Sequence, residues 1–297
     1  QDTRRDRSRH QFGQGKVWLK SVHHTDAGCN GKTRLIAARD RNGDGRNDLL
    51  TSQANGDLIL YPGGGGGSVT AGRIIGRGWN GLRSITTAGD LNGDKFPDLL
   101  ATRTSDGALL MYAGNEDGSL RGGVVWGKSW GVFSQVVGGS DLDGDTFPDV
   151  FARLGGAMNT YSTDATGRLV RSIRWGSGWG GFTQLSTGAD WNGDGIVDLI
   201  AVNPALSNGT LNLYAGTGKR AFETRPAALP AIPGASLVRL VGDVNADGSV
   251  AAVARVRTDD TLVLLLGRPG SPFAAPVPIG PVWPAFPLLP PALVHSP

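Results

Sequence analysis

The sequence predicts an all-β protein, a β-propeller made of four-stranded blades, and three observations support this prediction. Of the 26 acidic residues only Glu116 and Glu223 are glutamates, and the 297-residue chain contains 47 glycines. Asp favours turns and helix caps whereas Glu favours helix interiors, so this composition indicates strands joined by loops. An aspartate-rich loop recurs about every 50 residues, and each repeat divides into four short strand-like segments.

The aspartate loop has nine residues, whose positions are numbered one to nine. The first copy reads Asp40-Arg-Asn-Gly-Asp-Gly-Arg-Asn-Asp48, and Tyr61 follows it; the next three copies are followed by a tyrosine at a similar distance. A register kept over this length indicates a repeated structural unit. The five copies, the last of them degenerate, occupy residues 40–48, 90–98, 141–149, 190–198 and 243–251.

The second repeat shows the four predicted strands of one blade, which are residues 84–89, 99–103, 108–112 and 124–126. Asp106-Gly107 lies between the second and third strands. Such a pair tolerates the positive φ angles of a type I′ turn, so we expect tight hairpins of this type. Four antiparallel strands per repeat, closed into a ring, are typical of a propeller because closure removes exposed sheet edges. The corresponding turn pairs are Asn55-Gly56, Gly155-Gly156 and Asn208-Gly209.

Five loops predict five blades, and the alternative is part of a six- or seven-bladed ring. We expect residues 1–15 to form a flexible basic arm and residues 16–294 to form the propeller. The proline-rich segment 268–297 is expected to close the ring by pairing with strands near Leu35. Proline removes a hydrogen-bond donor, so this closing strand is expected to be irregular or at a sheet edge.

The loops place oxygen ligands at positions one, three, five and nine. Two carboxylates 4 Å apart would repel each other by about 4 kcal/mol at an effective dielectric constant of about 20, so a divalent cation is expected between them. Oxygen ligands without His or Cys favour Ca²⁺, and the carbonyl at position seven adds a ligand. The four complete loops therefore predict four Ca²⁺ sites, made by Asp40, Asn42, Asp44, Arg46 and Asp48; Asp90, Asn92, Asp94, Phe96 and Asp98; Asp141, Asp143, Asp145, Phe147 and Asp149; and Asp190, Asn192, Asp194, Ile196 and Asp198.

An EF-hand is excluded because its loop requires a Glu at the twelfth position and helices on both sides. Here predicted strand residues, such as Thr51 and Ala101, hold the twelfth position. The alternative to a metal site is an Asp- and Asn-rich turn whose own backbone satisfies the side chains. That alternative is expected for the fifth loop, where Ala251 holds position nine.

The Asp-x-Asn-Gly-Asp-Gly-x-x-Asp-Leu loop in a β repeat resembles the FG-GAP/VCBS repeats of integrin-α-like propellers, over about residues 30 to 290. This resemblance implies Ca²⁺ in the loops and a secreted binding module, in some proteins appended to an enzyme. The repeats here are shorter than those of integrins and lack a clear Phe-Gly and Gly-Ala-Pro pair. The Gly-x-Gly-Trp-x-x-Phe pattern of residues 176–182 has a weaker resemblance to tachylectin-type lectin propellers.

A recurring tryptophan precedes several of the aspartate loops. An aromatic ring with an N–H donor can stack on a sugar and hydrogen-bond a hydroxyl group, so this tryptophan is a candidate ligand contact. The alternative is that it fills the space between blades. The candidate ligand-binding residues are Trp79, Trp130, Trp179 and Trp283.

The predicted function is a secreted, calcium-binding, carbohydrate-binding module, whose repeated sites would bind multivalently. The alternative is a platform for protein interaction or adhesion. We do not expect an enzyme, because the four histidines lie near the chain ends and form no catalytic group with neighbouring residues. The net charge is +3, but the basic residues are scattered, so no nucleic-acid partner is expected. No run of eighteen apolar residues occurs, and a soluble monomer without membrane insertion is expected.

Overall fold

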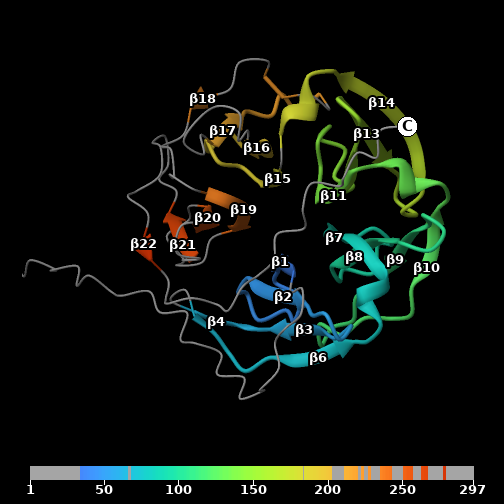
Figure 1. Ribbon diagram of the computed structural model, residues 1–297, viewed down its shortest axis with the longest axis vertical. Helices are drawn as coiled ribbons and strands as arrows, with labels where there is room; N and C mark the ends of the chain where they lie inside the picture. The colour runs from blue at the N-terminus through green and yellow to red at the C-terminus, as the bar shows by residue number, and fades with distance from the viewer. Residues whose placement is uncertain are drawn as a thin grey trace, which may run out of the picture.

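The computed structural model describes residues 34–65, 68–182, 184–202, 211–219, 222–223, 227–228, 235–242, 250–256, 262–266 and 277–278. These residues form five four-stranded sheets around a ring, together with one small two-stranded sheet (Figure 1). All strand pairs are antiparallel. The predicted all-β propeller of four-stranded blades is confirmed. The predicted arm at residues 1–15 lies outside the described residues.

Each sheet consists of strands that are consecutive in the sequence, apart from a small hairpin inserted in the first. The first sheet contains β1 (Arg34–Arg39), β2 (Asp48–Ser52), β3 (Leu58–Tyr61) and β6 (Arg73–Gly76), with the hairpin β4 (Gly63–Gly65) and β5 (Ser68–Val69) beside it. The second contains β7 (Leu82–Gly89), β8 (Asp98–Arg103), β9 (Leu109–Tyr112) and β10 (Val124–Gly127). The third contains β11 (Gln135–Ser140), β12 (Asp149–Leu154), β13 (Ala157–Thr163) and β14 (Leu169–Gly176).

The last two sheets repeat this arrangement with shorter outer strands. The fourth contains β15 (Gln184–Ala189), β16 (Asp198–Val202), β17 (Leu211–Tyr214) and β18 (Ala227–Ala228). The fifth contains β19 (Ala235–Gly242), β20 (Ala251–Val256), β21 (Leu262–Leu266) and β22 (Val277–Pro278). The helices of the described residues are three-residue 3-10 turns, none of which is long enough to cross a bilayer.

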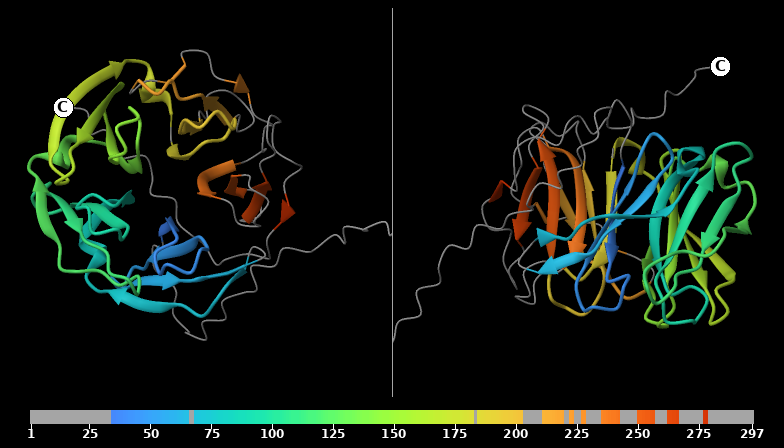
Figure 2. Two further views of the ribbon diagram at one scale, coloured as in Figure 1. Left: turned by 180° about the vertical axis from the view of Figure 1, so that it is seen from behind. Right: turned by 90° about the horizontal axis from the view of Figure 1, so that it is seen from below.

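The inner strands β1, β7, β11, β15 and β19 face the middle of the ring (Figure 1). Each contacts the next inner strand, and β19 also contacts β1. The strands run between the two faces of the ring, as the edge-on view in Figure 2 shows. Within the predicted closing segment, β22 pairs with β21 and so belongs to the fifth sheet. The remainder of that segment lies outside the described residues.

The hydrophobic core lies between neighbouring sheets. One cluster joins Leu50 and Leu60 of the first sheet to Leu99 of the second, and similar clusters lie at the next three junctions. The second strand of a sheet has neighbours on both faces, so most of its residues are buried; all five residues of β16 are buried, and the four that follow Asp198 are apolar. The packing between blades therefore explains the continuous apolar runs that follow the aspartate loops.

The predicted type I′ turns between the second and third strands are wrong. Type I′ requires a positive φ at both central residues, but at Asn55-Gly56 and at Asp106-Gly107 only the glycine has one, 93° and 70°. The side chain of Asn55 accepts a hydrogen bond from the Asp57 N–H at 3.0 Å, which holds Asn55 in an ordinary turn conformation before a left-handed glycine. At Gly155-Gly156 only the first residue has a positive φ, and Asn208-Gly209 lies outside the described residues.

Candidate functional site

The four complete aspartate loops share one hydrogen-bonding pattern. Each loop connects an inner strand to the second strand of its sheet. In the second loop, Asp90 at position one accepts hydrogen bonds from the N–H groups of Gly93, Asp94 and Lys95, at 2.8, 3.0 and 2.8 Å. The same three bonds occur in the other loops, to Asp40, Asp141 and Asp190. The repeated sequence therefore folds into one repeated backbone conformation, with the position-one carboxylate at its centre.

Position six of this loop requires a left-handed backbone. Gly45 and Gly195 adopt φ angles of 81° and 85° there, and Lys95 and Thr146 adopt 75° and 77°. Such angles are unfavourable for residues with a Cβ atom, especially a β-branched one. The N–H of position six donates to the aspartate of position one in all four loops, so this bond holds the strained residues in place.

The aspartate at position nine connects three of the loops to the end of the third strand. In the second sheet, Asp98 is fully buried and accepts hydrogen bonds from the N–H of Leu91 at 2.9 Å and from the N–H of Gly114 at 2.9 Å. Asp48 and Asp198 make the equivalent pairs of bonds. In these three loops position nine is a structural hydrogen-bond acceptor, a role that the sequence analysis did not assign.

A sequence signal for this role is the glycine that lies two residues after the tyrosine of the repeat. It is Gly63, Gly114 or Gly216 in the first, second and fourth repeats. A Cβ atom at Gly114 would lie only 2.4 Å from the carbonyl oxygen of Pro97, and the other two glycines are equally close to the backbone of their loops. Glycine is required because the third strand must approach the loop closely enough to donate its N–H.

The third loop departs from this pattern. Asp149 accepts a hydrogen bond from the N–H of Leu142 at 2.9 Å, but Thr163 replaces the glycine. The Thr163 hydroxyl donates instead to the carbonyl of Pro148 at 2.7 Å. As a result, Oδ1 of Asp149 has no hydrogen-bond partner, although the residue is only 1% exposed.

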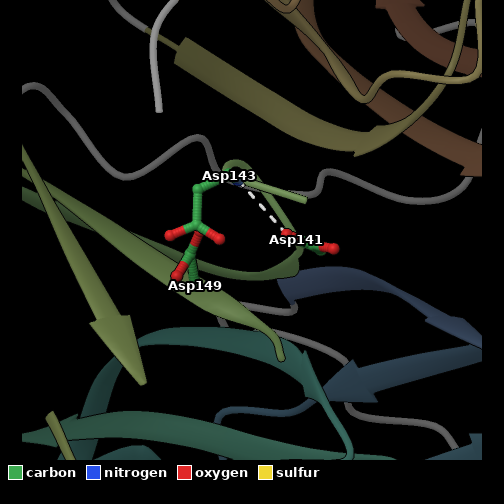
Figure 3. Close-up of side chains that lie close together, drawn as sticks. All are labelled: Asp141, Asp143 and Asp149. Atoms are coloured by element: carbon green, nitrogen blue, oxygen red, sulfur yellow. Dashed lines mark hydrogen bonds between the residues drawn. The ribbon is translucent and has the colours of Figure 1, made fainter. Parts of the chain in front are cut away.

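Three carboxylates converge in the third loop (Figure 3). Asp141, Asp143 and Asp149 offer oxygen atoms that lie within 4.8 Å of one another. Asp143 holds position three, where the other complete loops have Asn, and the hydroxyl of Ser162 donates to it at 3.3 Å. The charge, the oxygen ligands and the unpartnered buried atom of this loop fit a divalent cation.

Burial raises the pKa of the position-nine aspartates. For Asp149 the pKa rises to about 7, since desolvation is opposed by one backbone hydrogen bond and reinforced by the other carboxylates of the loop. For Asp98, burial raises the pKa to about 6, with two backbone hydrogen bonds opposing it. Burial also raises the pKa values of Asp48 and Asp198. The third loop therefore has the least favourable surroundings for a negative charge without a cation.

A buried arginine adjoins the first two loops. Arg41 holds position two of the first loop, is 1% exposed, and its three guanidinium nitrogens have no hydrogen-bond partner. Burial lowers its pKa to about 10, and the charges of Asp98 and Asp48 oppose that change. The second and third loops have Leu at this position. Arg41 therefore places a positive charge close to the position-nine aspartates of two neighbouring blades.

The predicted ligand-binding tryptophans lie at the junctions between blades. Trp79 and Trp130 are 3% and 5% exposed, and Trp179 is half-buried. Their rings contact tyrosines of the following sheet, with centroids 4.5 Å from Tyr112 and 4.8 Å from Tyr161 for the first two. Trp179 contacts Tyr214 in the same way at 5.0 Å. Trp283 lies outside the described residues. Burial of the first two rings favours the alternative that they fill the space between blades.

A family model for the FG-GAP-like repeat matches residues 40–101 and 190–253. The chain carries FG-GAP-like repeats. The matched residues include the first, second, fourth and fifth aspartate loops, together with residues of the strands that follow them. No curated protein matches the sequence.

Several solved structures are distantly similar to these FG-GAP-like repeats. A lectin from Agrocybe aegerita, described as recognising non-reducing terminal N-acetylglucosamine, is 14% identical with a TM-score of 0.49; the match covers 84% of this chain and 66% of the lectin. A mutant of AofleA from Arthrobotrys oligospora is 10% identical with a TM-score of 0.46, over 87% of this chain and 92% of that one. The V. cholerae biofilm matrix protein Bap1 is 18% identical with a TM-score of 0.34, over 90% of this chain and 43% of that one. At these scores the likeness carries no information about what this chain binds.

Proposed function

We propose that this chain is a secreted, calcium-binding propeller of five blades that acts as a carbohydrate-binding module. The observation that carries the calcium proposal is Oδ1 of Asp149, a buried carboxylate oxygen without a donor beside the carboxylates of Asp141 and Asp143. Leaving such an atom unsatisfied costs about 1–3 kcal/mol or more when it is charged. A Ca²⁺ ion at this place would supply the missing partner.

The other three complete loops are proposed to bind one Ca²⁺ each, because they share the backbone conformation of the third. The ion would be held by the side chains of positions one, three, five and nine and by the carbonyl of position seven. In the second loop these are Asp90, Asn92, Asp94, Asp98 and the carbonyl of Phe96. Ca²⁺ bound there would join the inner strand to the second strand of the sheet. The ion therefore stabilises the end of each blade.

Five blades are supported by the five four-stranded sheets and by the contact between β19 and β1. A secreted location is proposed from the similarity to FG-GAP-like repeats, which are typical of extracellular proteins. A binding role, rather than a catalytic one, is proposed because the aspartates with strongly raised pKa values in the described residues are accounted for as loop ligands. We also propose that the chain is a monomer.

Carbohydrate binding was predicted from tryptophans that repeat at blade junctions. Trp179 is the member of this set that we propose as a sugar contact, because it is half-buried and stacks on Trp175 with ring centroids 5.5 Å apart. Trp79 and Trp130 are assigned to packing. A change of Trp179 to Ala is expected to weaken glycan binding, and binding equal to that of the unchanged protein would remove this residue from the proposal.

A second candidate function is a platform for a protein partner. The outer strands of the first three sheets expose Ile74, Val124, Val125 and Val170, with 48%, 53%, 52% and 58% of each residue accessible to solvent. Exposed apolar side chains on outer strands favour contact with another protein surface. A Val124→Asp and Val125→Asp double variant separates the two functions: it would abolish partner binding on this surface but leave glycan binding unchanged.

Three measurements test the proposed function. Native mass spectrometry in calcium acetate is expected to show four Ca²⁺ ions per chain, and EDTA is expected to lower the melting temperature, because an ion that binds only the folded state stabilises it. A melting temperature that EDTA does not change would overturn the calcium proposal. A glycan array should show saturable binding; an array without any bound glycan would overturn the carbohydrate proposal and leave the protein-platform candidate.

A further inference from the structure

A cavity of about 330 Å³ lies between the second and third aspartate loops. Its lining includes the ends of three inner strands, namely Arg39 of β1, Gly89 of β7 and Gly139 of β11. It therefore lies toward the middle of the ring, on the face from which the aspartate loops project. Small-molecule sites occupy about 300–1,000 Å³, so this volume suits a ligand of the size of one monosaccharide unit.

The glycines at the strand ends have positive φ angles, 66° at Gly89 and 94° at Gly139. A Cβ atom at Gly89 would lie 2.9 Å from the ring of Pro148, and one at Gly139 would lie 3.0 Å from the carbonyl oxygen of Thr87. The first repeat has Arg39 at the position that Gly89 holds in the second repeat. Arg39 therefore lines a cavity that β7 and β11 border with the glycines Gly89 and Gly139.

The lining combines three kinds of group. Asp90 and Asp141 supply carboxylates from two loops, and Arg39 supplies a guanidinium group from a third blade. Phe147 and Pro148 supply apolar surface. The carboxylates of Asp90 and Asp141 already accept three and four backbone N–H bonds, so the hydroxyl group of Thr146, which also lines the cavity, is the acceptor offered to a ligand. A sugar has this complementary chemistry, with an apolar ring face, several hydroxyl donors and oxygen acceptors.

We propose that this cavity is a sugar-binding site of the propeller, separate from the contact proposed at Trp179, and that it holds one monosaccharide unit. The sugar ring lies against Phe147, one of its hydroxyl groups donates to the hydroxyl oxygen of Thr146, and one of its oxygens accepts a hydrogen bond from Arg39. This inference rests on the proposed carbohydrate-binding function and assigns it to a place that the tryptophan pattern did not indicate.

Filling the cavity tests the assignment. Ala165 lines the cavity from the exposed hairpin after β13, so Ala165→Trp places a large side chain in it. Glu116→Trp is the matched control. Glu116 holds the equivalent position in the hairpin after β9, which has the same two backbone hydrogen bonds, and it does not line this cavity. The affinity for the best glycan of the array is measured by isothermal titration calorimetry, and the melting temperature of each variant by calorimetry.

We expect at least tenfold weaker sugar binding by Ala165→Trp and binding within twofold of the unchanged protein by Glu116→Trp. Unchanged affinity in Ala165→Trp, or an equal loss in Glu116→Trp, would overturn the cavity assignment while the carbohydrate-binding function stands. If the unchanged protein binds no glycan, the proposed function itself fails.

A second variant covers the case in which Ala165→Trp lowers the melting temperature. Arg39→Gln removes the guanidinium group but keeps a side chain of similar length, and we expect about tenfold weaker sugar binding. Arg168→Gln is its control, because Arg168 is an exposed arginine of the hairpin that carries Ala165 and does not line the cavity. If Arg39→Gln and Arg168→Gln bind the sugar equally well, the site lies elsewhere.

Discussion

The third aspartate loop and the other three complete loops have the same backbone conformation but differ in how position nine is satisfied. Asp98 and Asp48 each accept hydrogen bonds from two backbone N–H groups, and Asp198 accepts three. Asp149 accepts one, since Thr163 stands where the other blades have a glycine. The same repeated motif thus yields three loops that the backbone can satisfy and one that needs a further partner.

The charge around the loops increases this difference. The third loop has a third converging carboxylate, Asp143, whereas the first two loops share the nearby positive charge of Arg41. A cation at the third loop therefore removes more repulsion than a cation at the first or second. We expect the third loop to bind Ca²⁺ most tightly.

The largest expected effect comes from removing a position-nine aspartate that accepts two backbone hydrogen bonds. Asp98→Ala leaves two buried N–H groups without an acceptor, at about 1–3 kcal/mol each, so we expect a loss of about 2–6 kcal/mol in the free energy of unfolding. Asp149→Ala in the same buffer removes one such bond and an unpartnered carboxylate, and should cost less. Urea denaturation in EDTA measures both, and an equal loss would show that the two aspartates have the same role.

Calcium should increase the free energy of unfolding that is lost when the Asp149 carboxylate is removed. At 100 times the dissociation constant, a bound ion stabilises the folded state by about 2.7 kcal/mol. Asp149→Asn is expected to abolish the tightest Ca²⁺ site in a calorimetric titration and to reduce the ion count in native mass spectrometry by one. Asp143→Asn gives the third loop the position-three residue of the others and should weaken the site without abolishing it. A titration in which Asp149→Asn loses only a weak site would contradict the proposed ranking.

Arg41→Leu tests the role of the buried guanidinium group. Leu stands at the same loop position in the second and third repeats, and Arg41→Leu removes a buried guanidinium group without a hydrogen-bond partner, whose burial is unfavourable. We therefore expect a higher melting temperature in EDTA and tighter Ca²⁺ binding at the first two loops. A lower melting temperature would show that Arg41 has a stabilising role.

The pH dependence of stability should also distinguish the third loop. Burial raises the pKa of Asp149 to about 7, so between about pH 4 and pH 7 the folded state binds more protons than the unfolded state. Stability in EDTA should therefore fall as pH rises through this window, by about 1–2 kcal/mol between pH 5 and pH 7.

Two comparisons check the origin of this slope. Asp149→Asn should reduce it, because the variant has no carboxyl group to titrate at that place, while Asp98, whose pKa burial raises to about 6, retains part of the slope. Saturating Ca²⁺ should also oppose it, since the ion binds the ionised carboxylate and its stabilising effect grows with pH. A slope that persists unchanged in Asp149→Asn would assign the titration to another group.

The smallest expected effect concerns position six. Lys95→Gly and Thr146→Gly should each stabilise the folded protein by about 0.5–1 kcal/mol, because glycine adopts the left-handed conformation without strain but loses more entropy on folding. The reverse change Gly195→Thr should destabilise by a similar amount. Melting temperatures in EDTA provide the measurement, and a destabilised Lys95→Gly would mean that the lysine side chain has a contact that outweighs the strain.

Local features of the fold followed from the sequence. In the second repeat, the predicted segments 99–103 and 108–112 correspond to β8 and β9 within a residue at either end, and the aspartate loops lie between strands as expected. These features depend on short-range periodicity and on residues that favour turns. The type I′ turns were wrong because the side chains of Asn55 and Asp106 hydrogen-bond to their own turns, a competition that the residue pair does not reveal.

The repeat by itself determined the class of fold, the position of the loops and the chemistry of their ligands, since each depends on residues close together in the chain. The tertiary structure decided which groups meet across a blade or between blades. Only packing shows that Trp79 and Trp130 are buried against tyrosines of the following sheet. Only the approach of the third strand to the loop separates Asp98, with two backbone donors, from Asp149, with one, because a hydrogen-bond partner many residues away is set by the folded backbone.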